Sequence, residues 1–599
     1  MALRGGRIVG PLVAAALCLG LLVPVHSTGA APGERDRDNA TIRKMIGRMT
    51  LEEKVGQLFM TYAYGQSADD PAPAMVASNQ QTYGVDNFEQ LIDQYHLGGI
   101  IYFAWSNNVN NPTQIAGLSN GIQESALSQR SAIPLLVSTD QEQGVVVRVG
   151  PPATQFPGNM GLGAARKATY ARTAAEITGR ELRAIGINEN FAPVADVNVN
   201  AQNPVIGVRS FGSDPGLVST LTAAQVEGYQ SQNVSSTAKH FPGHGDTNVD
   251  SHTGLPVIHH TREELDTIDL PPFESAIERD IDAIMTAHIV VPALDDSGRP
   301  ATLSKPVLTG LLREQMDFDG LIVTDALTME GVRQTYGDER VPVEAIKAGA
   351  DVLLMPPDLD LAYNAVLDAV RSGEIGVGRI NKSVYRILNL KMERGLFKNP
   401  YVDEDAVPSK VGTPGHLGTA DEITNKTVTL VKNDDDVLPL QANSSQDVLV
   451  TGWGVSTTKT LADSFAERGA TTEVYETGAN PNEAQRQTAA TKAGSKDLVV
   501  VSSQRAWISS GQQELVRDLL ATGTPVIVLA VRDPYDIAYF TDAPTYVATY
   551  SYSPVSLKAT TRVLFGEVNP TGRLPVAIPT ADDPDTELYP YGHGLSYGG

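Results

Sequence analysis

The sequence predicts an α/β protein of two domains, a (β/α)8 barrel followed by a smaller α/β sandwich. Its 599 residues are too many for a single core. From about residue 41 to 398, short apolar runs alternate with amphipathic stretches, which indicates a parallel sheet covered on both faces. Polar, reactive residues follow several of these runs, as they do at the carboxyl-terminal face of a barrel.

The apolar runs predict the strands of the barrel, with helical patterns such as 169–182 and 341–348 between them. The predicted strands are 99–103, 135–139, 190–194, 236–240, 283–288, 321–324 and 352–355. Seven or eight such units favour a barrel, or a relative with a missing or distorted strand, over a doubly wound sheet. The deciding observation is the set of polar residues at strand ends, because a barrel brings all of these ends to one face. They are Asp140, Lys239, His240, His288 and Asp325.

The rest of the chain divides at a polar segment. A helical pattern at 380–394 closes the barrel region, and residues 399–425 are rich in Gly, Pro and Asp, which is typical of a linker. A second α/β pattern then occupies residues 426–599, and it predicts the α/β sandwich. Its strands are expected near 448–451, 498–502, 526–531 and 546–551.

The N-terminus has the pattern of a signal peptide, predicted over residues 1–31. Arg4 and Arg7 precede an apolar run at 12–23, and small residues follow it. The run is shorter than the roughly 20 residues that cross a bilayer. We therefore expect a secreted protein, extracellular or associated with the cell wall. The only cysteine, Cys18, lies in this run and follows Leu17 rather than a small residue, which disfavours lipid anchoring.

The chain is acidic, with a formal net charge of −24. Nucleic acids and anionic membranes attract basic surfaces, so the charge argues against both as partners. We expect no nucleic-acid partner and no membrane insertion. The charge suits a soluble exported protein and does not indicate its substrate.

Five of the ten histidines fall between residues 240 and 260, in and after the segment KHFPGHGDTNVDSH at 239–252. So many polar groups and glycines after a strand predict a functional loop rather than a buried core. One interpretation is an acid/base histidine, because Asp250 and His252 are two residues apart and point the same way in an extended segment. A second interpretation is a solvated histidine-rich turn. The third is a zinc site, and spacing alone does not separate it from the acid/base histidine. Its ligands would be His240, His244 and His252 with Asp246 or Asp250.

Other residues suit sugar chemistry. Asp325 follows the apolar run at 321–323, where a carboxylate could attack an anomeric carbon, although aspartates also cap helices at such places. Arg148 and Arg209 could hold hydroxyl or carbonyl oxygens, although single arginines are more often surface ion pairs.

Longer motifs make the resemblance specific. The segment 239–252 resembles the signature of β-N-acetylglucosaminidases of glycoside hydrolase family 3, and motifs along essentially the whole mature chain agree with it in order. They are DQE at 140–142, FPGN at 156–159, NPVIGVRSF at 203–211, TDALTM at 324–329, LFGEVNPTGRLPVAIP at 564–579 and YPYGHGLSY at 589–597.

The resemblance implies a role for each site residue. Asp325 corresponds to the nucleophile, which forms a covalent glycosyl-enzyme, His252 to the general acid/base, and Asp250 to the partner of that histidine. The residues that correspond to binders of the terminal sugar are Asp140, Arg148, Arg209, Lys239 and His240. The family needs no metal or other cofactor, which disfavours the zinc interpretation, and we expect a monomer.

One residue departs from the family's pattern. Members often read Asp-Gln-Glu-Gly-Gly-Arg, whereas Gln143 follows Glu142 here. If the backbone at this place has a positive φ, Gln143 strains the loop that carries Asp140. Arg148 keeps its spacing from Asp140.

The expected function is therefore that of a secreted retaining β-N-acetylglucosaminidase, which removes terminal β-linked GlcNAc from cell-wall muropeptides or chitin-type oligosaccharides. A β-glucosidase or β-xylosidase of the same family would take its acid/base from a glutamate of the second domain, and the loop with Asp250 and His252 speaks against it. A phosphorylase is a closer alternative, because a histidine acid/base leaves room for phosphate. A non-catalytic wall-binding protein is disfavoured by the intact Asp325 and His252.

Overall fold

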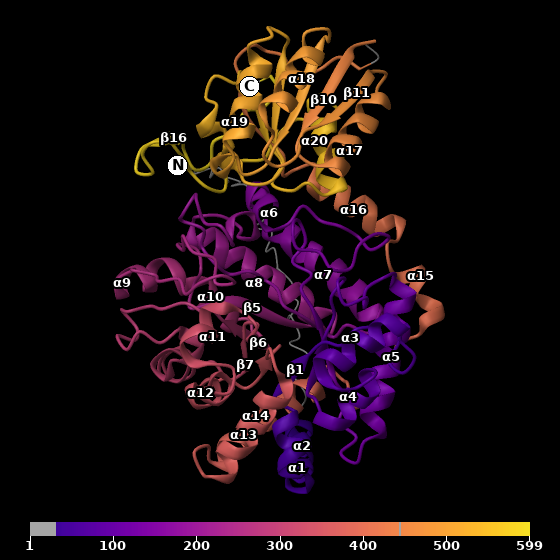
Figure 1. The fold of residues 1–599 in the computed structure, drawn as a ribbon, viewed down its shortest axis with the longest axis vertical. Coiled ribbons are helices and arrows are strands. Elements are labelled where there is room, and N and C mark those ends of the chain that lie inside the picture. Colours follow the sequence, from indigo (N-terminus) through magenta and orange to yellow (C-terminus); the bar gives the residue numbers. More distant parts are fainter. Residues whose placement is uncertain (1–31, 443–444, 599) are drawn as a thin grey trace, which may run out of the picture.

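The computed structural model describes residues 32–442 and 445–598, which form two β-sheets with their own layers of helices (Figure 1). The predicted signal peptide and Cys18 lie outside these residues. No helix in the part of the chain described is long and apolar enough to cross a membrane.

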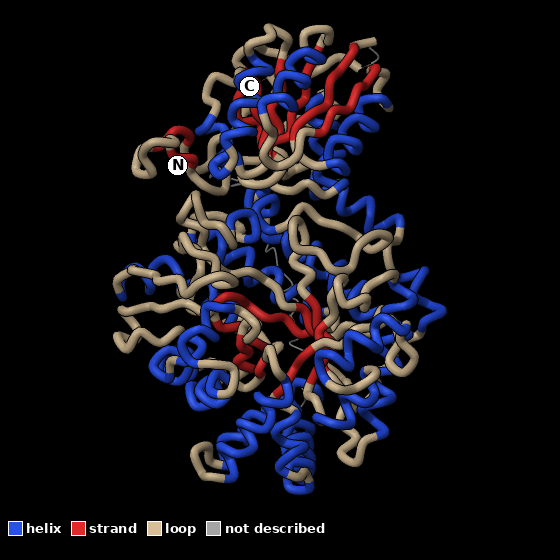
Figure 2. Tube along the Cα trace, viewed as in Figure 1, coloured by secondary structure: helices blue, strands red, loops and turns tan. Residues whose placement is uncertain are grey.

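The first sheet is a barrel of eight parallel strands in the order β7-β6-β5-β4-β3-β2-β1-β8. The strands are β1 (Phe59–Thr61), β2 (Gly99–Ile101), β3 (Leu136–Thr139), β4 (Glu189–Asn190), β5 (Ser235–Phe241), β6 (Ala283–Thr286), β7 (Leu321–Thr324) and β8 (Leu353–Leu354). A bridge between Val323 and Val352 joins β7 to β8 and closes the ring. The predicted barrel is confirmed, and its residues are buried along every strand because helices cover the outside (Figure 2).

Helices surround this sheet, and several begin at a residue whose side chain accepts a hydrogen bond from the first turn, as Asn111 and Asp214 do. They are α1 (Pro32–Arg48), α2 (Leu51–Gly56), α3 (Pro73–Tyr83), α4 (Phe88–Tyr95), α5 (Pro112–Ser128), α6 (Asn159–Ala165), α7 (Ala168–Ala184), α8 (Pro215–Ser231), α9 (Arg262–Glu264), α10 (Pro271–Ile277), α11 (Glu330–Tyr336), α12 (Arg340–Ala348), α13 (Leu359–Arg371) and α14 (Val377–Glu393). Two π-helices, η2 (Leu265–Asp269) and η4 (Pro306–Gln315), and the 3-10 turns η1 (Gly207–Arg209) and η3 (Ala301–Leu303) complete the barrel.

The segment predicted as a linker, 399–425, is folded against the barrel. It contains η5 (Glu404–Ala406), α15 (Val407–Lys410) and α16 (Pro414–Thr424). The Asn120 side chain of α5 pairs with both backbone groups of Val402, at 2.9 and 3.0 Å. The predicted domain ends at residues 398 and 426 stay predictions.

The second sheet has six strands in the order β11-β10-β12-β13-β14-β9, all parallel except β9. They are β9 (Thr429–Asn433), β10 (Asp447–Gly452), β11 (Thr471–Glu476), β12 (Leu498–Ser503), β13 (Val526–Ala530) and β14 (Thr545–Ala548), with a small pair β15 (Ile578–Pro579) and β16 (Glu587–Tyr589) beside them. One face packs on α17 (Val455–Ala466) and α20 (Pro554–Leu564), the other on α18 (Glu483–Ala493) and α19 (Ser510–Leu520). Successive residues of β12 and β13 point to opposite cores, which makes the predicted α/β sandwich. The 3-10 turns η6 (Ala506–Ile508) and η7 (Pro534–Tyr539) follow β12 and β13.

Candidate active site

The polar residues that follow the barrel strands meet at one end of the barrel, as the sequence predicts. Lys239 and His240 end β5, Asp140 follows β3, and Asp325 follows β7. The loop after β4 brings Arg209, and the loop after β5 brings Asp250 and His252. Loops at this face are where barrel enzymes hold their substrates.

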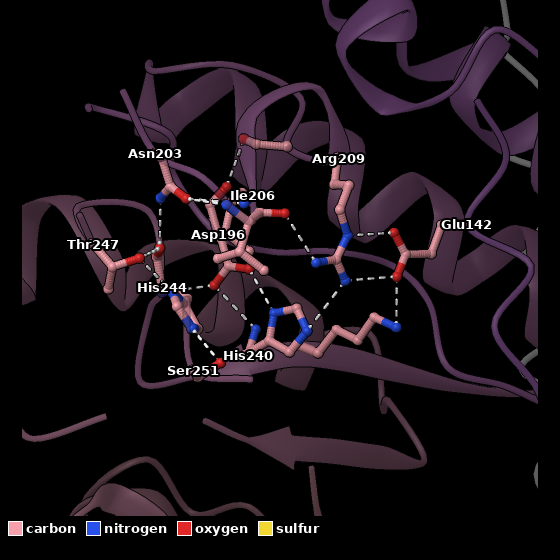
Figure 3. Close-up of polar contacts among 12 residues, drawn as sticks. Glu142, Asp196, Asn203, Ile206, Arg209, His240, His244, Thr247 and Ser251 are labelled. Atoms are coloured by element: carbon pink, nitrogen blue, oxygen red, sulfur yellow. Dashed lines mark hydrogen bonds and ion pairs between the residues drawn. The ribbon is translucent and has the colours of Figure 1, made fainter. Parts of the chain in front are cut away.

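Four charged side chains form a largely buried cluster, and Figure 3 labels two of them, Arg209 and Glu142. The Lys239 ammonium lies 2.8 Å from Asp140 and 2.7 Å from Glu142, and only 2% of the lysine side chain is exposed. The Arg209 guanidinium donates a hydrogen bond to each carboxylate oxygen of Glu142, at 2.8 and 2.9 Å. Two cations thus balance two carboxylates, which offsets the cost of burying them.

Glu142 is the centre of this cluster, and the sequence motif DQE was the only signal for it. Burial alone would raise the pKa of its carboxyl, but Arg209 and Lys239 lower that pKa well below its usual range. The buried carboxylate therefore stays ionised and fixes the two cations. Both cations can then present their remaining N–H groups to hydroxyl or carbonyl oxygens.

Arg148 lies at the edge of the cluster. Its guanidinium is 3.7 Å from Asp140, its side chain is 31% exposed, and it stands over the Phe103 ring at 5.6 Å. The pair with Asp140 is longer than a hydrogen bond, so Arg148 keeps donors free for another ligand.

Asp196 holds the two histidines that line this region, and the sequence analysis missed it. One oxygen accepts the backbone N–H groups of His240 and His244, at 3.0 and 2.8 Å, and the other accepts Nδ1–H of His240 at 2.8 Å (Figure 3). Nε2 of His240 is therefore an acceptor toward Arg209, 3.4 Å away. Asp196 lies two residues after the predicted strand 190–194, so the rule that found Asp140 and Asp325 could have found it.

His244 is structural. Its ring nitrogens contact Thr247 at 2.8 Å and Ser251 at 3.1 Å, inside the loop after β5. Burial lowers the pKa of His244 to about 4, so the ring is neutral near pH 7. It stabilises the path of the loop from β5 to His252.

Asp250 and His252 form a pair at the exposed part of this loop. Nδ1 of His252 lies 2.6 Å from Asp250, which also accepts the backbone N–H of His252 at 2.9 Å. The hydrogen bond that His252 donates to the Asp250 carboxylate raises the pKa of His252, and the same bond lowers the pKa of Asp250 to about 2. Nε2 points away from Asp250, and the ring is 62% exposed, so a proton on Nε2 is accessible to a ligand.

Asp325 lies at the carboxyl end of β7 and accepts the N–H of Ala326 at 2.7 Å. Burial would raise the pKa of its carboxyl, but electrostatic interactions with His240, His288 and Lys239 and the hydrogen bond from the Ala326 amide lower it. His288, which follows β6, is held by Thr302 at 2.8 Å and Ala326 O at 3.1 Å. Asp325 is thus an ionised carboxylate beside the charge cluster.

The backbone connects the loop of His252 to that of Asp325. The N–H of Gly331, at the start of α11, donates to Ser251 O at 3.2 Å. A Cβ on Gly331 would lie 2.6 Å from Gly254 O, so the two loops approach each other closely. Asp325 also contributes to the raised pKa of His252.

The zinc interpretation needs three converging ligands. Among residues 32–442 and 445–598, no three His, Cys, Asp or Glu side chains converge in that way. The three histidines named for the site point to different partners instead, namely Asp196, Thr247 with Ser251, and Asp250.

Gln143, which stands where family members often have glycine, has the positive φ that the sequence analysis considered for this place. Its φ is +71°, in the left-handed region that favours glycine. The side chain is buried, donates to Thr178 Oγ1 at 2.9 Å and accepts the N–H of Phe156 at 3.1 Å. These bonds compensate the strain, and Asp140 still reaches Lys239.

A barrel that brings together an ionised aspartate, a carboxylate-bonded histidine and a cluster of charged side chains has the arrangement of a glycosidase-type site. Residues 50–390 match the model of the glycosyl hydrolase family 3 N terminal domain, and residues 428–597 match that of its C-terminal domain. The chain belongs to glycoside hydrolase family 3 and is a glycoside hydrolase.

Relatives cover both domains. Beta-hexosaminidase A of Pseudoalteromonas piscicida is 38% identical over 420 residues, 66% of this chain and 69% of the relative. A beta-N-acetylglucosaminidase/beta-glucosidase of Cellulomonas fimi is 28% identical over 91% of this chain and 97% of its own length. The solved structure of a family 3 beta-N-acetylglucosaminidase from Paenibacillus sp. str. FPU-7 superposes with a TM-score of 0.80 at 37% identity, covering 89% of this chain and 99% of that one.

Proposed function

We propose that this enzyme is a retaining β-N-acetylglucosaminidase with Asp325 as nucleophile and His252 as general acid/base. The observation that carries the proposal is the pair of Asp250 and His252, 2.6 Å apart, on a loop that contacts the loop of Asp325. The relative from Pseudoalteromonas piscicida and the Paenibacillus structure, named for hexosaminidase and N-acetylglucosaminidase activity, support the choice of sugar.

In the first step, the Asp325 carboxylate attacks the anomeric carbon while His252 gives its Nε2 proton to the departing oxygen. The bond to the aglycone breaks, and a covalent glycosyl-aspartate forms. In the second step, neutral His252 takes a proton from water, which attacks the same carbon and releases the sugar and Asp325. Asp250 is the positioning residue, because it accepts the Nδ1–H of His252. It thereby stabilises the imidazolium that carries the Nε2 proton in the first step and leaves Nε2 as the base in the second.

In this proposal, the charge cluster binds the terminal sugar. Asp140 and Lys239 offer an acceptor and donors side by side, and Arg209 and His240 lie next to them. Arg148 adds a cation at the rim. Such groups discriminate strongly between sugars, because a missing substituent leaves a buried polar group unpaired.

The first experiment compares 4-nitrophenyl β-GlcNAc with 4-nitrophenyl β-glucoside, with and without inorganic phosphate. We expect at least a tenfold preference for the GlcNAc glycoside in kcat/KM, unchanged by phosphate. Equal rates on both glycosides would reject the assignment of the sugar. Release of a sugar phosphate in the presence of phosphate would show that the enzyme is a phosphorylase and not a hydrolase.

A second experiment tests the nucleophile. Asp325→Asn removes the only carboxylate proposed to form the covalent intermediate, so turnover of every glycoside should be lost. A fluorinated GlcNAc-type inactivator should label Asp325, and label on any other carboxylate would refute its role.

The natural substrate and location follow from the same proposal. We propose that the enzyme acts after secretion, on terminal β-linked GlcNAc of cell-wall muropeptides or chitin-type oligosaccharides. The pattern at residues 1–31 supports export. Mass spectrometry of the protein recovered from the culture medium tests it, since a chain that begins near residue 32 is expected there and an uncleaved chain retained in the cell contradicts it.

A further inference from the structure

We propose that Trp105 is a platform on which a sugar ring beyond the terminal one stacks, a step that rests on the proposed function. Trp105 lies in the loop after β2, and 55% of the side chain is exposed, although an aromatic cluster holds it. Nothing in the mechanism above uses this ring. The ligand class is a β-linked pyranose of the aglycone.

The cluster fixes the orientation of the Trp105 ring. Phe103 stacks on it, with 4.9 Å between ring centroids and 23° between planes. Tyr62 and Tyr64, which follow β1, meet it nearly edge-on at 4.6 and 5.9 Å. Phe103 occupies one face, and the high exposure of Trp105 indicates that the opposite face is open to solvent.

The backbone beneath the platform is tied down by one buried side chain. Asn108 donates to Ala63 O at 3.0 Å and to Gly65 O at 2.8 Å, and it accepts the N–H of Phe103 at 3.3 Å. This amide joins the loop after β1 to the loop after β2. A platform held in this way loses little conformational entropy when a ligand binds.

The platform adjoins the charge cluster. Arg148 stands over the Phe103 ring at 5.6 Å, and the same guanidinium is 3.7 Å from Asp140. Asp140, Arg148, Phe103 and Trp105 thus contact one another in this order, and Trp105 is separated from Arg148 by the Phe103 ring. A glycan whose terminal sugar lies against Asp140 can extend over this rim.

The chemistry of the two surfaces is complementary. The face of an indole carries negative charge density, and the face of an equatorially substituted pyranose presents C–H groups. A single exposed ring is too small for a protein interface. A sugar fits the size and the orientation of the patch.

The test compares chitobiose with methyl β-GlcNAc, which has the same bond and no second ring. For Trp105→Ala we expect the ratio of the two kcat/KM values to fall about 10-fold, the usual scale of one aromatic stacking contact. Trp105→Tyr keeps a ring and should restore most of the ratio, which also guards against misfolding of the alanine variant. Tyr401→Ala, which removes an aromatic side chain that is 40% exposed in the 399–425 segment, is the control and should leave the ratio unchanged.

A ratio unchanged in Trp105→Ala would overturn the platform, as would an equal loss on both substrates. Failure of the unaltered enzyme to cleave any GlcNAc glycoside would instead reject the proposed function. Repeating the comparison with GlcNAc-β-1,4-MurNAc separates the two sources of the second ring, because the larger effect of Trp105 identifies the one that stacks.

Discussion

Four histidines of β5 and of the loop that follows it each have their own carboxylate or hydroxyl partner, and that partner determines the role of each ring. Asp196 and Thr247 hold His240 and His244 inside the fold. Asp250 leaves the outer nitrogen of His252 accessible. His260 lies between two carboxylates, with Nδ1 2.7 Å from Asp269 and Nε2 3.3 Å from Asp246.

The pH dependence of stability should reveal the pair of carboxylates around His260. Hydrogen bonds that His260 donates to the Asp246 and Asp269 carboxylates raise its pKa from 6.5 to about 10. The stabilisation is therefore complete below pH 6.5 and is lost as the pH rises toward 10. We expect His260→Ala to destabilise the barrel by about 2 kcal/mol at pH 6 and by much less at pH 10. Thermal unfolding of both proteins across this range measures it, and a difference that grows with pH would contradict the pairing.

Gln143 gives a second prediction at this scale, in which two effects compete. Gln143→Gly relieves a left-handed backbone conformation that costs a non-glycine residue roughly 1–2 kcal/mol. It also removes three buried hydrogen bonds, with Thr154 O, Thr178 Oγ1 and Phe156 N–H, and leaves the Phe156 N–H unpaired, which costs about 2–4 kcal/mol. The variant should be less stable by about 1–2 kcal/mol, measured by denaturant unfolding. A gain in stability would show that the strain exceeds the value of the side chain.

At the scale of elements, the site depends on where loops meet, and the sequence could predict only part of this. Strand ends were predictable because apolar runs are distinct, and they placed Asp140, Lys239 and Asp325 on one face. Strand β1 was missed, since its three residues run directly into Tyr62 and Tyr64 without a polar boundary. Glu142 and Asp196 were missed as functional residues, because burial of a charge depends on partners that are distant in sequence.

The contact between Gly331 and the loop of His252 can be tested directly. In Gly331→Ala, the added Cβ would lie 2.6 Å from Gly254 O and 3.0 Å from Ser251 O, so the loop must move. We expect kcat on a chitin disaccharide to fall roughly 10²-fold, because general acid catalysis requires His252 at the leaving oxygen. Gly378→Ala is the matched control, since that helical glycine has no atom within 4 Å of the new Cβ. An unaltered kcat for Gly331→Ala would show that the loop position does not matter.

At the scale of the whole molecule, the second domain supports the barrel site from outside. Arg505 donates to Pro204 O at 2.7 Å and pairs with Asp533 at 3.3 Å. Asp533 in turn lies so close to Gly207 that a Cβ there would be 2.5 Å from its carboxylate. Gly207 begins the turn that carries Arg209, so the second domain contacts the turn of a residue that we propose to bind the sugar.

Loss of this support should raise KM. Arg505→Ala frees the turn at 207–209, and we expect KM for 4-nitrophenyl β-GlcNAc to rise about tenfold with a smaller change in kcat. Arg517→Ala, which removes a half-exposed arginine from the same domain, should leave both parameters unaltered. If Arg505→Ala behaves like the control, the turn needs no support from the second domain.

The central claim, that His252 is the general acid/base, is tested most directly by the leaving-group dependence of His252→Ala. A poor leaving group must be protonated as it departs, whereas a dinitrophenolate leaves unaided. The account predicts a loss of about 10²–10⁴-fold in kcat/KM on chitobiose and a nearly unaltered first step on the dinitrophenyl glycoside, with a burst and acceleration by azide. The same loss on both substrates, without a burst or azide rescue, would contradict it and direct attention to a glutamate of the second domain.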